Sequence, residues 1–150
     1  YGQNITVGEL VALGRTPYTG FWGTLSPADR AIVAESMRLV GISGLADRRV
    51  ATLSDGERQK TMVAKALAQQ TPVMLLDEPT AFLDYPSKVE LMTLLRRLAE
   101  ERRLTILVST HDLEIALRTA HRLWILSDRG LCEGAPEEMK GEVERCFFRS

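Results

Sequence analysis

LSDGERQKTMVAKALAQQTPVMLLDEPTAFLD, the sequence of residues 53–84, contains three short motifs one after another. In LSDGE (53–57) a glutamate follows a serine by three residues, a pattern that predicts the capped start of a helix. VMLLDEPT (73–80) is an apolar run that predicts a buried strand and ends in two carboxylates. AFLD (81–84) then leads toward a second helical pattern. The segment therefore predicts a helix, a strand, and a loop that places acidic side chains at the carboxyl end of the strand.

The remainder of the second half repeats this alternation. Apolar spacing predicts helices at 57–70, 87–102 and 113–120, and strands at 73–77, 105–109 and 123–126, followed by a turn at 127–130 that returns the chain as a hairpin through Cys132. Apolar strands joined by helices predict an α/β fold with a mostly parallel sheet that is covered on both faces.

The first 52 residues are predicted to be helical instead. Thr6 and Glu9 form a capping-box pattern, and Gly14 is placed to end the helix that they begin. Ser26 precedes a proline at a second helix start, and Gly41 is placed to end that helix. We expect a helical subdomain at 1–52, the α/β core at 53–135 and a C-terminal tail at 136–150.

Composition limits the function classes. The chain has 150 residues, of which 45% are hydrophobic, enough for a core. Lys plus Arg number 19 and Asp plus Glu 20, so a net charge of −1 gives no electrostatic case for binding nucleic acid. No apolar stretch approaches the ~20 residues that cross a bilayer. Cys132 and Cys146 lie far from the motifs, which favours thiols in a reducing compartment over a disulfide or metal site.

The order and content of the motifs resemble the ATP-binding-cassette (ABC) ATPases, from about Thr6 to about Pro136. The resemblance implies part of a P-loop NTPase (RecA-like) three-layer core, preceded by an α-helical subdomain. It makes LSDGE the signature loop, VMLLD the Walker B strand and Leu83-Asp84 the D-loop. His111, which follows the apolar run 105–108, becomes the switch histidine.

The candidate ATP-binding loop consists of Ser54, Asp55, Gly56 and Glu57. Helix capping alone accounts for the serine and the glutamate. The same geometry also makes an anion site, because a helix N-terminus presents bare N–H groups. The resemblance implies that Ser54 and Gly56 cap the γ-phosphate of ATP held by the opposite protomer. Asp55 and Glu57 depart from the commonest family pattern, LSGGQ, and a carboxylate repels a triphosphate unless it points away or meets a cation.

The carboxyl ends of the two predicted strands carry the other candidate residues. The resemblance implies that Asp77 holds Mg²⁺ through water and that Glu78 orients and polarises the attacking water. It also implies that His111 contacts the γ-phosphate and that Asp84 reaches across a dimer interface. Signature and Walker motifs of this family face each other only between protomers, so a head-to-tail homodimer with two ATP molecules is expected.

The sequence contains no G-x-x-x-x-G-K-[ST] phosphate loop. That loop holds the β- and γ-phosphates and Mg²⁺ in P-loop NTPases. We expect the chain to be the C-terminal portion of a cassette whose phosphate loop and Q-loop glutamine lie upstream of Tyr1. By itself it is expected to bind ATP poorly and to be inactive.

The segment from Thr6 to Tyr18, with its Gly-Arg-Thr-Pro-Tyr stretch, resembles importer ATPases for iron-siderophore complexes, haem and cobalamin. In that subfamily the region lies near the groove that receives a helix of the membrane permease. Candidate permease contacts are Arg15, Tyr18, Phe21 and Trp22, and local packing of these side chains is the alternative.

The leading hypothesis is therefore an ATPase subunit that couples ATP hydrolysis to import. Its expected partners are a second ATPase protomer, integral membrane permease subunits and, indirectly, a periplasmic substrate-binding protein. Its expected place is the cytoplasmic face of a bacterial cell membrane. One alternative is a soluble cassette ATPase acting on nucleic acid or ribosomes, although the inserts and basic linkers of such proteins are not seen. The remaining alternatives are a non-catalytic binding or regulatory cassette and a stable structural fragment without activity of its own.

Overall fold

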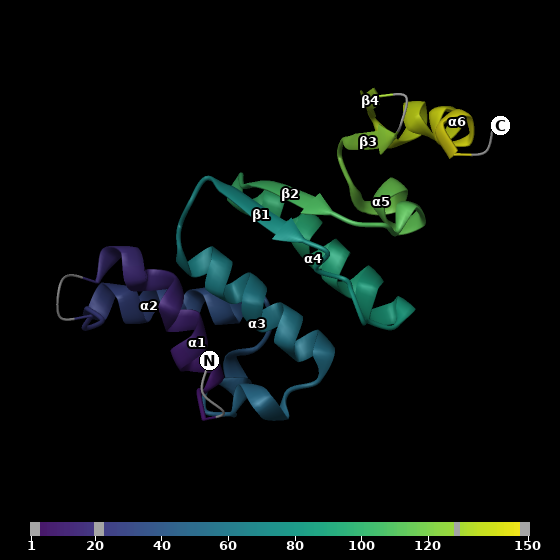
Figure 1. The fold of residues 1–150 in the computed structure, drawn as a ribbon. Helices are drawn as coiled ribbons and strands as arrows, with labels where there is room; N and C mark the ends of the chain where they lie inside the picture. Colours follow the sequence, from purple (N-terminus) through teal and green to yellow (C-terminus); the bar gives the residue numbers. More distant parts are fainter. Residues whose placement is uncertain (1–3, 20–22, 128–129, 148–150) are drawn as a thin grey trace. The chain divides into compact units, whose positions relative to one another are not determined.

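A computed structural model describes residues 4–19, 23–127 and 130–147, with the side chains described up to residue 141 (Figure 1). The chain divides into two units, Tyr1–Val108 and Ser109–Ser150, and each is described by itself. The helices are α1 (Val7–Ala12), α2 (Pro27–Leu39), α3 (Asp55–Ala68), α4 (Tyr85–Arg102), α5 (Leu113–Thr119) and α6 (Pro136–Phe147), with 3₁₀ turns η1 (Leu13–Tyr18), η2 (Ser43–Leu45) and η3 (Val50–Thr52). The strands are β1 (Val73–Asp77), β2 (Thr105–Ser109), β3 (Leu123–Ser127) and β4 (Gly130–Gly134).

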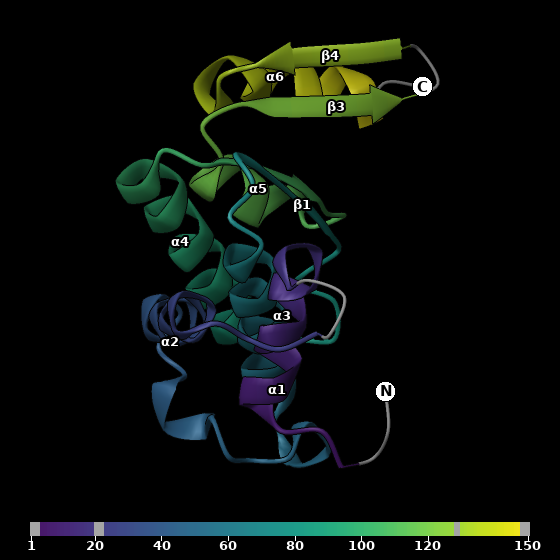
Figure 2. The same cartoon turned by 90° about the vertical axis from the view of Figure 1, so that its left-hand side faces the viewer.

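Helices α1, α2 and α3 pack together at the start of the first unit (Figure 2). Each begins with a capping box, and the cap residues are Thr6, Ser26 and Ser54. Fully buried side chains between the helices include Val7, Val11 and Val63. The predicted helical start of the chain is confirmed, with element bounds close to those expected.

Helix α1 ends at Ala12, close to Gly14 as predicted, but Gly14 is not a left-handed helix end. The chain continues through it as η1, and Gly14 is buried. A Cβ atom on Gly14 would lie 2.3 Å from the carbonyl oxygen of Lys65, in α3. Glycine is therefore needed because two backbones approach closely, which is a contact between distant residues that spacing could not reveal. Gly41, in contrast, has φ +77° directly after α2 and ends that helix as expected.

Strands β1 and β2 are neighbours in one sheet and run parallel (Figure 1). The intervening helix α4 buries a row of leucines, including Leu91, Leu95 and Leu98. These observations confirm the α/β class and the parallel strands. Side chains alternate along β1, where Met74 is buried and its neighbours Val73 and Leu75 are exposed.

The exposed face of this sheet differs from the expectation that both faces are covered. Val73 is 49% exposed, Leu75 71% and Leu107, on β2, 46%. Within the described residues one face of the β1–β2 sheet is packed and the other is apolar and open.

The second unit contains α5, the β3–β4 hairpin and α6. The strands are antiparallel, with Trp124 opposite Glu133 and Leu126 opposite Leu131, which confirms the predicted hairpin. The two residues at the centre of its turn, 128 and 129, lie outside the described residues. The core of the second unit is formed by Ala116, Leu123, Ile125 and Met139, and Cys132 packs against it. Among the described residues, no helix is long and apolar enough to cross a bilayer.

Candidate functional site

The loop that begins α3 is held by its own hydrogen bonds. The backbone N–H of Ser54 donates to Oε2 of Glu57 (2.8 Å), and the N–H of Glu57 donates to Oγ of Ser54 (3.2 Å). The other carboxylate oxygen of Glu57 accepts from Nη1 of Arg48 at 3.1 Å. The Ser54 N–H, and then Arg48, lower the pKa of Glu57. Its carboxylate is thus directed into the loop and toward a cation.

The remaining loop residues face outward. Ser54 and Asp55 are exposed, and Asp55 is the first residue of α3. A Cβ atom on Gly56 would meet nothing within 4 Å, so neither packing nor a positive φ requires glycine there. The first turn of α3 therefore offers backbone N–H groups and an unobstructed surface at Gly56, a combination that suits an anion brought from outside.

The loop after β1 presents two carboxylates with an unusual backbone. Asp77 ends the strand and is exposed, whereas Glu78 is half-buried. Glu78 has φ +46°, the left-handed region that L-residues rarely adopt. A tight turn follows, in which the N–H of Ala81 donates to the carbonyl of Glu78 at 3.0 Å. Such a conformation costs about 1–3 kcal/mol and is found disproportionately at functional sites. Nothing in the sequence signalled it.

In the AFLD segment Phe82 and Asp84 are both exposed, but only the acid is engaged in a hydrogen bond of the local fold. Phe82 is 94% exposed and has φ +65°, while Leu83 is buried beside it. Asp84 is the N-cap of α4, where its Oδ1 accepts from the N–H of Ser87 (3.0 Å). Hydrogen bonding from the side chain of Ser87, and then from its N–H, lowers the pKa of Asp84. The structure therefore engages Asp84 in helix capping, and it presents Phe82, which sequence reasoning did not single out.

His111 belongs to the second unit, two residues after Ser109, the last residue of β2. It is exposed, and its carbonyl accepts from the N–H of Leu113 (3.2 Å). Asp112 caps α5 through the N–H of Ile115 (3.4 Å). Among the predicted site residues, the structure places Asp77, Glu78 and Asp84 on one continuous loop and Ser54 to Glu57 at the start of another element.

Asp77 has the chemistry expected of a Mg²⁺ ligand, since it is an exposed carboxylate at the carboxyl end of a parallel strand. In the part of the chain that the structure describes, no group of three or more His, Cys, Asp or Glu side chains could hold a metal ion. Mg²⁺ is commonly held by one or two carboxylates together with the phosphates of a nucleotide, and Asp77 fits that arrangement.

Arg15, predicted as a permease contact, is buried. Only 5% of it is exposed, and it forms an ion pair with Asp29. Tyr18 is half exposed, but its hydroxyl donates to the carbonyl of Gln69 (2.8 Å). Local packing, the alternative, is therefore the correct interpretation for Arg15. Phe21 and Trp22 lie outside the described residues.

Comparison with known proteins identifies the family of this chain. The family model described as "ABC transporter" matches residues 2–81. An uncharacterised ABC transporter ATP-binding protein of Methanocaldococcus jannaschii is 46% identical over 142 residues, 93% of this chain and 49% of that protein. The ferric enterobactin transport ATP-binding protein of Escherichia coli is 42% identical over 137 residues, 91% of this chain and 51% of that protein.

The fold is also shared with solved structures. An inward-facing ABC transporter ascribed to the metal-chelate type matches with a TM-score of 0.89 and 24% identity, covering 96% of this chain and 58% of that one. The chain spans about half the length of the curated relatives it matches. Because the family model covers more than half of the 150 residues and the fold agrees, this chain belongs to the ABC transporter family.

Proposed function

We propose that this chain supplies the signature loop and the water-activating carboxylate of an ABC importer ATPase. The observation that carries the proposal is the loop after β1, where Asp77 is exposed and Glu78 is held in a left-handed turn. Phosphoryl transfer depends mainly on positioning and on charge stabilisation, and a carboxylate fixed in this way suits the positioning of water.

In this proposal each candidate residue has one role. Asp77 holds Mg²⁺ through water, and Glu78 polarises the attacking water. His111 contacts the γ-phosphate and keeps the water in register. Ser54 and Gly56 cap the γ-phosphate of a nucleotide on the opposite protomer, with Asp55 and Glu57 completing the loop. The engagement of Glu57 by Arg48 supports this role, because it reduces the negative charge that the loop presents to a triphosphate.

The phosphate loop must come from other polypeptide, because these 150 residues contain none. The open apolar face of the β1–β2 sheet supports this division, since further layers of an α/β domain would cover Leu75 and Leu107. We retain 1–52 as the helical subdomain, 53–135 as part of the ATPase core and 136–150 as the tail.

Proteins of this family dimerise and work with membrane permeases. We propose a head-to-tail homodimer, with Asp84 and its loop at the interface, bound to permease subunits on the cytoplasmic face of a bacterial membrane. A periplasmic binding protein would act indirectly. The E. coli relative is named as a ferric enterobactin transport ATP-binding protein. That name supports an iron-siderophore cargo, and haem and cobalamin are the related alternatives.

The test is ATP hydrolysis by the full product of the gene, measured with the permease encoded beside it in proteoliposomes. We expect Mg²⁺-dependent hydrolysis that a siderophore-loaded binding protein stimulates and that RNA or ribosomes leave unchanged. No Mg²⁺-dependent hydrolysis would contradict the ATPase role. Stimulation by RNA or ribosomes alone would contradict the importer role.

A further inference from the structure

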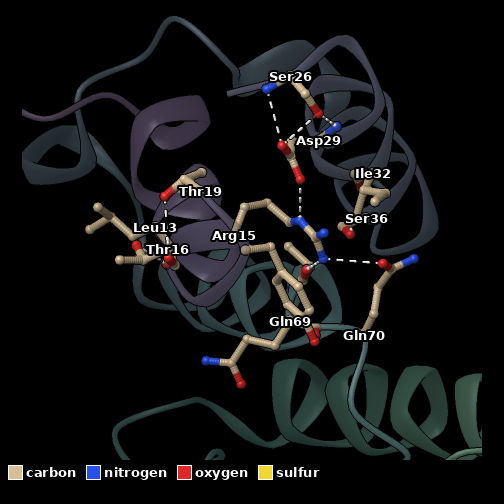
Figure 3. Close-up of polar contacts among 12 residues, drawn as sticks. Leu13, Arg15, Thr16, Thr19, Ser26, Asp29, Ile32, Ser36, Gln69 and Gln70 are labelled. Carbon is tan, nitrogen blue, oxygen red and sulfur yellow. Dashed lines mark hydrogen bonds and ion pairs between the residues drawn. The ribbon is translucent and has the colours of Figure 1, made fainter. Parts of the chain in front are cut away.

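Arg15 joins three elements through one buried cation (Figure 3). Its Nε donates to Oδ1 of Asp29 at 2.9 Å. Its Nη1 donates to the carbonyl of Ala68 at 2.8 Å and to Oε1 of Gln70 at 3.1 Å. The side chain is 6% exposed and that of Asp29 is 10% exposed, so water competes little for these bonds.

Two side chains of η1 cap the end of α3: Arg15 bonds to Ala68 and Tyr18 bonds to Gln69. The last carbonyls of a helix lack intrahelical partners, and a cation there also interacts favourably with the helix dipole. Arg15 supplies that cation to Ala68, the last residue of α3. The hydroxyl of Tyr18 donates to the carbonyl of Gln69, and the centroid of its ring lies 4.0 Å from the guanidinium carbon of Arg15. Two side chains of η1 therefore close the C-terminal turn of α3.

Gly14 allows this cap to form. A Cβ on Gly14 would lie 2.3 Å from the Lys65 carbonyl oxygen and 3.0 Å from the Cβ of Ala68. The backbone of η1 thus lies directly against the last turn of α3, which brings Arg15 within reach of the helix end.

Asp29 extends the link to α2. Its Oδ2 accepts from Oγ of Ser26 (2.6 Å) and from the N–H of Ser26 (3.0 Å), which forms the capping box of α2. Its Oδ1 is left for Arg15. Ser26, and then Arg15, lower the pKa of Asp29, so the charged form that makes both contacts is favoured.

A buried ion pair is seldom more stabilising than apolar side chains of similar volume, but it is directional. The helix that Arg15 caps begins at the signature loop, and its 14 residues span about 21 Å at 1.5 Å per residue. Past its other end, Gln70 takes a left-handed turn and the chain enters β1 at Val73. The capped end is therefore the point where the helix that begins beside Ser54 leads into the strand that ends in Asp77.

We propose that Arg15 is a positioning residue for the signature loop. By fixing the C-terminal end of α3 against η1 and α2, it sets the position of the whole helix and hence of Ser54 and Gly56. This proposal rests on the proposed function for its consequence in ATP hydrolysis, but the displacement of the loop can be measured separately.

The first experiment records backbone amide NMR shifts of the 150-residue chain with Arg15→Met and Arg15→Lys, after thermal unfolding has shown which variants fold. Arg96→Met is the matched control, because Arg96 pairs with Glu100 on the exposed surface of α4. We expect both Arg15 variants to shift the amides of Ser54 to Glu57, and the control to leave them in place. Lysine keeps the charge but cannot donate to Asp29 and Ala68 in the geometry of a guanidinium. If Arg15→Met unfolds the chain, the amide shifts of Arg15→Lys therefore show whether Arg15 positions the loop. Shifts confined to η1 and the last turn of α3 would overturn the proposal.

The second experiment measures ATP binding and turnover in the full product of the gene. We expect Arg15→Lys to reduce kcat by about two- to thirtyfold, the range for residues that couple sites without touching a ligand, and to leave ATP affinity unchanged. Equal loss of affinity and turnover, or unchanged turnover, would contradict a positioning role. If the unaltered protein hydrolyses no ATP, the proposed function fails, while the amide shifts still decide whether Arg15 positions the loop.

Discussion

Arg102, the last residue of α4, donates to the carboxylate of Glu35 on α2 at 2.5 Å, although the two residues are 67 positions apart. Arg38 donates to the same carboxylate through two nitrogens, at 2.7 and 2.8 Å. Arg97 adds a bond from α4 to the carbonyl of Leu39 (3.3 Å). Helix α2 is therefore tied to α4, the helix that follows the candidate catalytic loop.

This arrangement predicts an acid-sensitive contribution to stability. Arg38 first, and then Arg102, lower the pKa of Glu35 from 4.5 to about 2. Because the folded-state pKa is depressed, the contribution is complete above about pH 4.5 and is lost as the pH falls through 2. Glu35→Gln should lower the free energy of unfolding at pH 7, and its difference from the unaltered chain should shrink between pH 4.5 and 2. Urea unfolding at several pH values measures this.

The matched control is Glu114→Gln, because Glu114 pairs with Arg118 on one exposed helix at 3.6 Å. It should change stability little at any pH. A Glu35→Gln difference that stays constant down to pH 2 would show that the ion pairs contribute nothing specific to folding.

The N-terminal cap of α3 is predicted to stabilise the chain. Ser54→Ala removes the acceptor for the N–H of Glu57 and should cost about 0.5–2 kcal/mol, whereas Ser54→Gly should cost only a few tenths. Urea denaturation of the 150-residue chain would compare the two variants. Equal stability of Ala, Gly and Ser at this position would argue that the cap does not hold the loop.

The leucine row of α4 is predicted to dominate the core of the first unit. Leu98 is 0% exposed, so Leu98→Ala should destabilise by about 2–5 kcal/mol. Leu75→Ala is the control, since Leu75 is 71% exposed on the open face of the sheet and should change stability by about 0.5 kcal/mol or less. Similar losses for both, measured by denaturant unfolding, would mean that the open face is covered in solution.

The 150-residue chain by itself is predicted to bind ATP weakly, because it contains no phosphate loop to hold the β- and γ-phosphates. Titration with a fluorescent ATP analogue in the presence of Mg²⁺ should show no saturation at micromolar concentrations. Saturable micromolar binding would indicate a nucleotide site built from these residues alone.

The sequence predicted the features that depend on neighbouring residues. The capping boxes at Thr6, Ser26 and Ser54 were readable because each joins residues only three positions apart. Strands were readable because β1 and β2 are continuous apolar runs. The roles of Gly14 and Arg15 were not readable, because each is set by contacts with α3 about fifty residues away.

The backbone conformation of the candidate site could not be predicted from the sequence either. Glu78 and Phe82 both adopt positive φ, and neither is a residue type that ordinarily does so. Their conformations are imposed by the succession of turns between β1 and α4, through bonds such as that from the N–H of Leu83 to the carbonyl of Thr80 (3.2 Å). The motif identified the chemistry of the loop, whereas its geometry required the fold.

The most direct test of the account is single-turnover ATP hydrolysis by the full product of the gene with Glu78→Gln. Because glutamine cannot accept a proton or polarise water as a carboxylate does, we expect hydrolysis to fall by about a hundredfold or more while ATP binding persists. Glu90→Gln, at an exposed position paired with Lys60, is the control and should hydrolyse ATP at the unaltered rate. Hydrolysis that is unchanged in Glu78→Gln would remove Glu78 from the reaction and contradict the central claim.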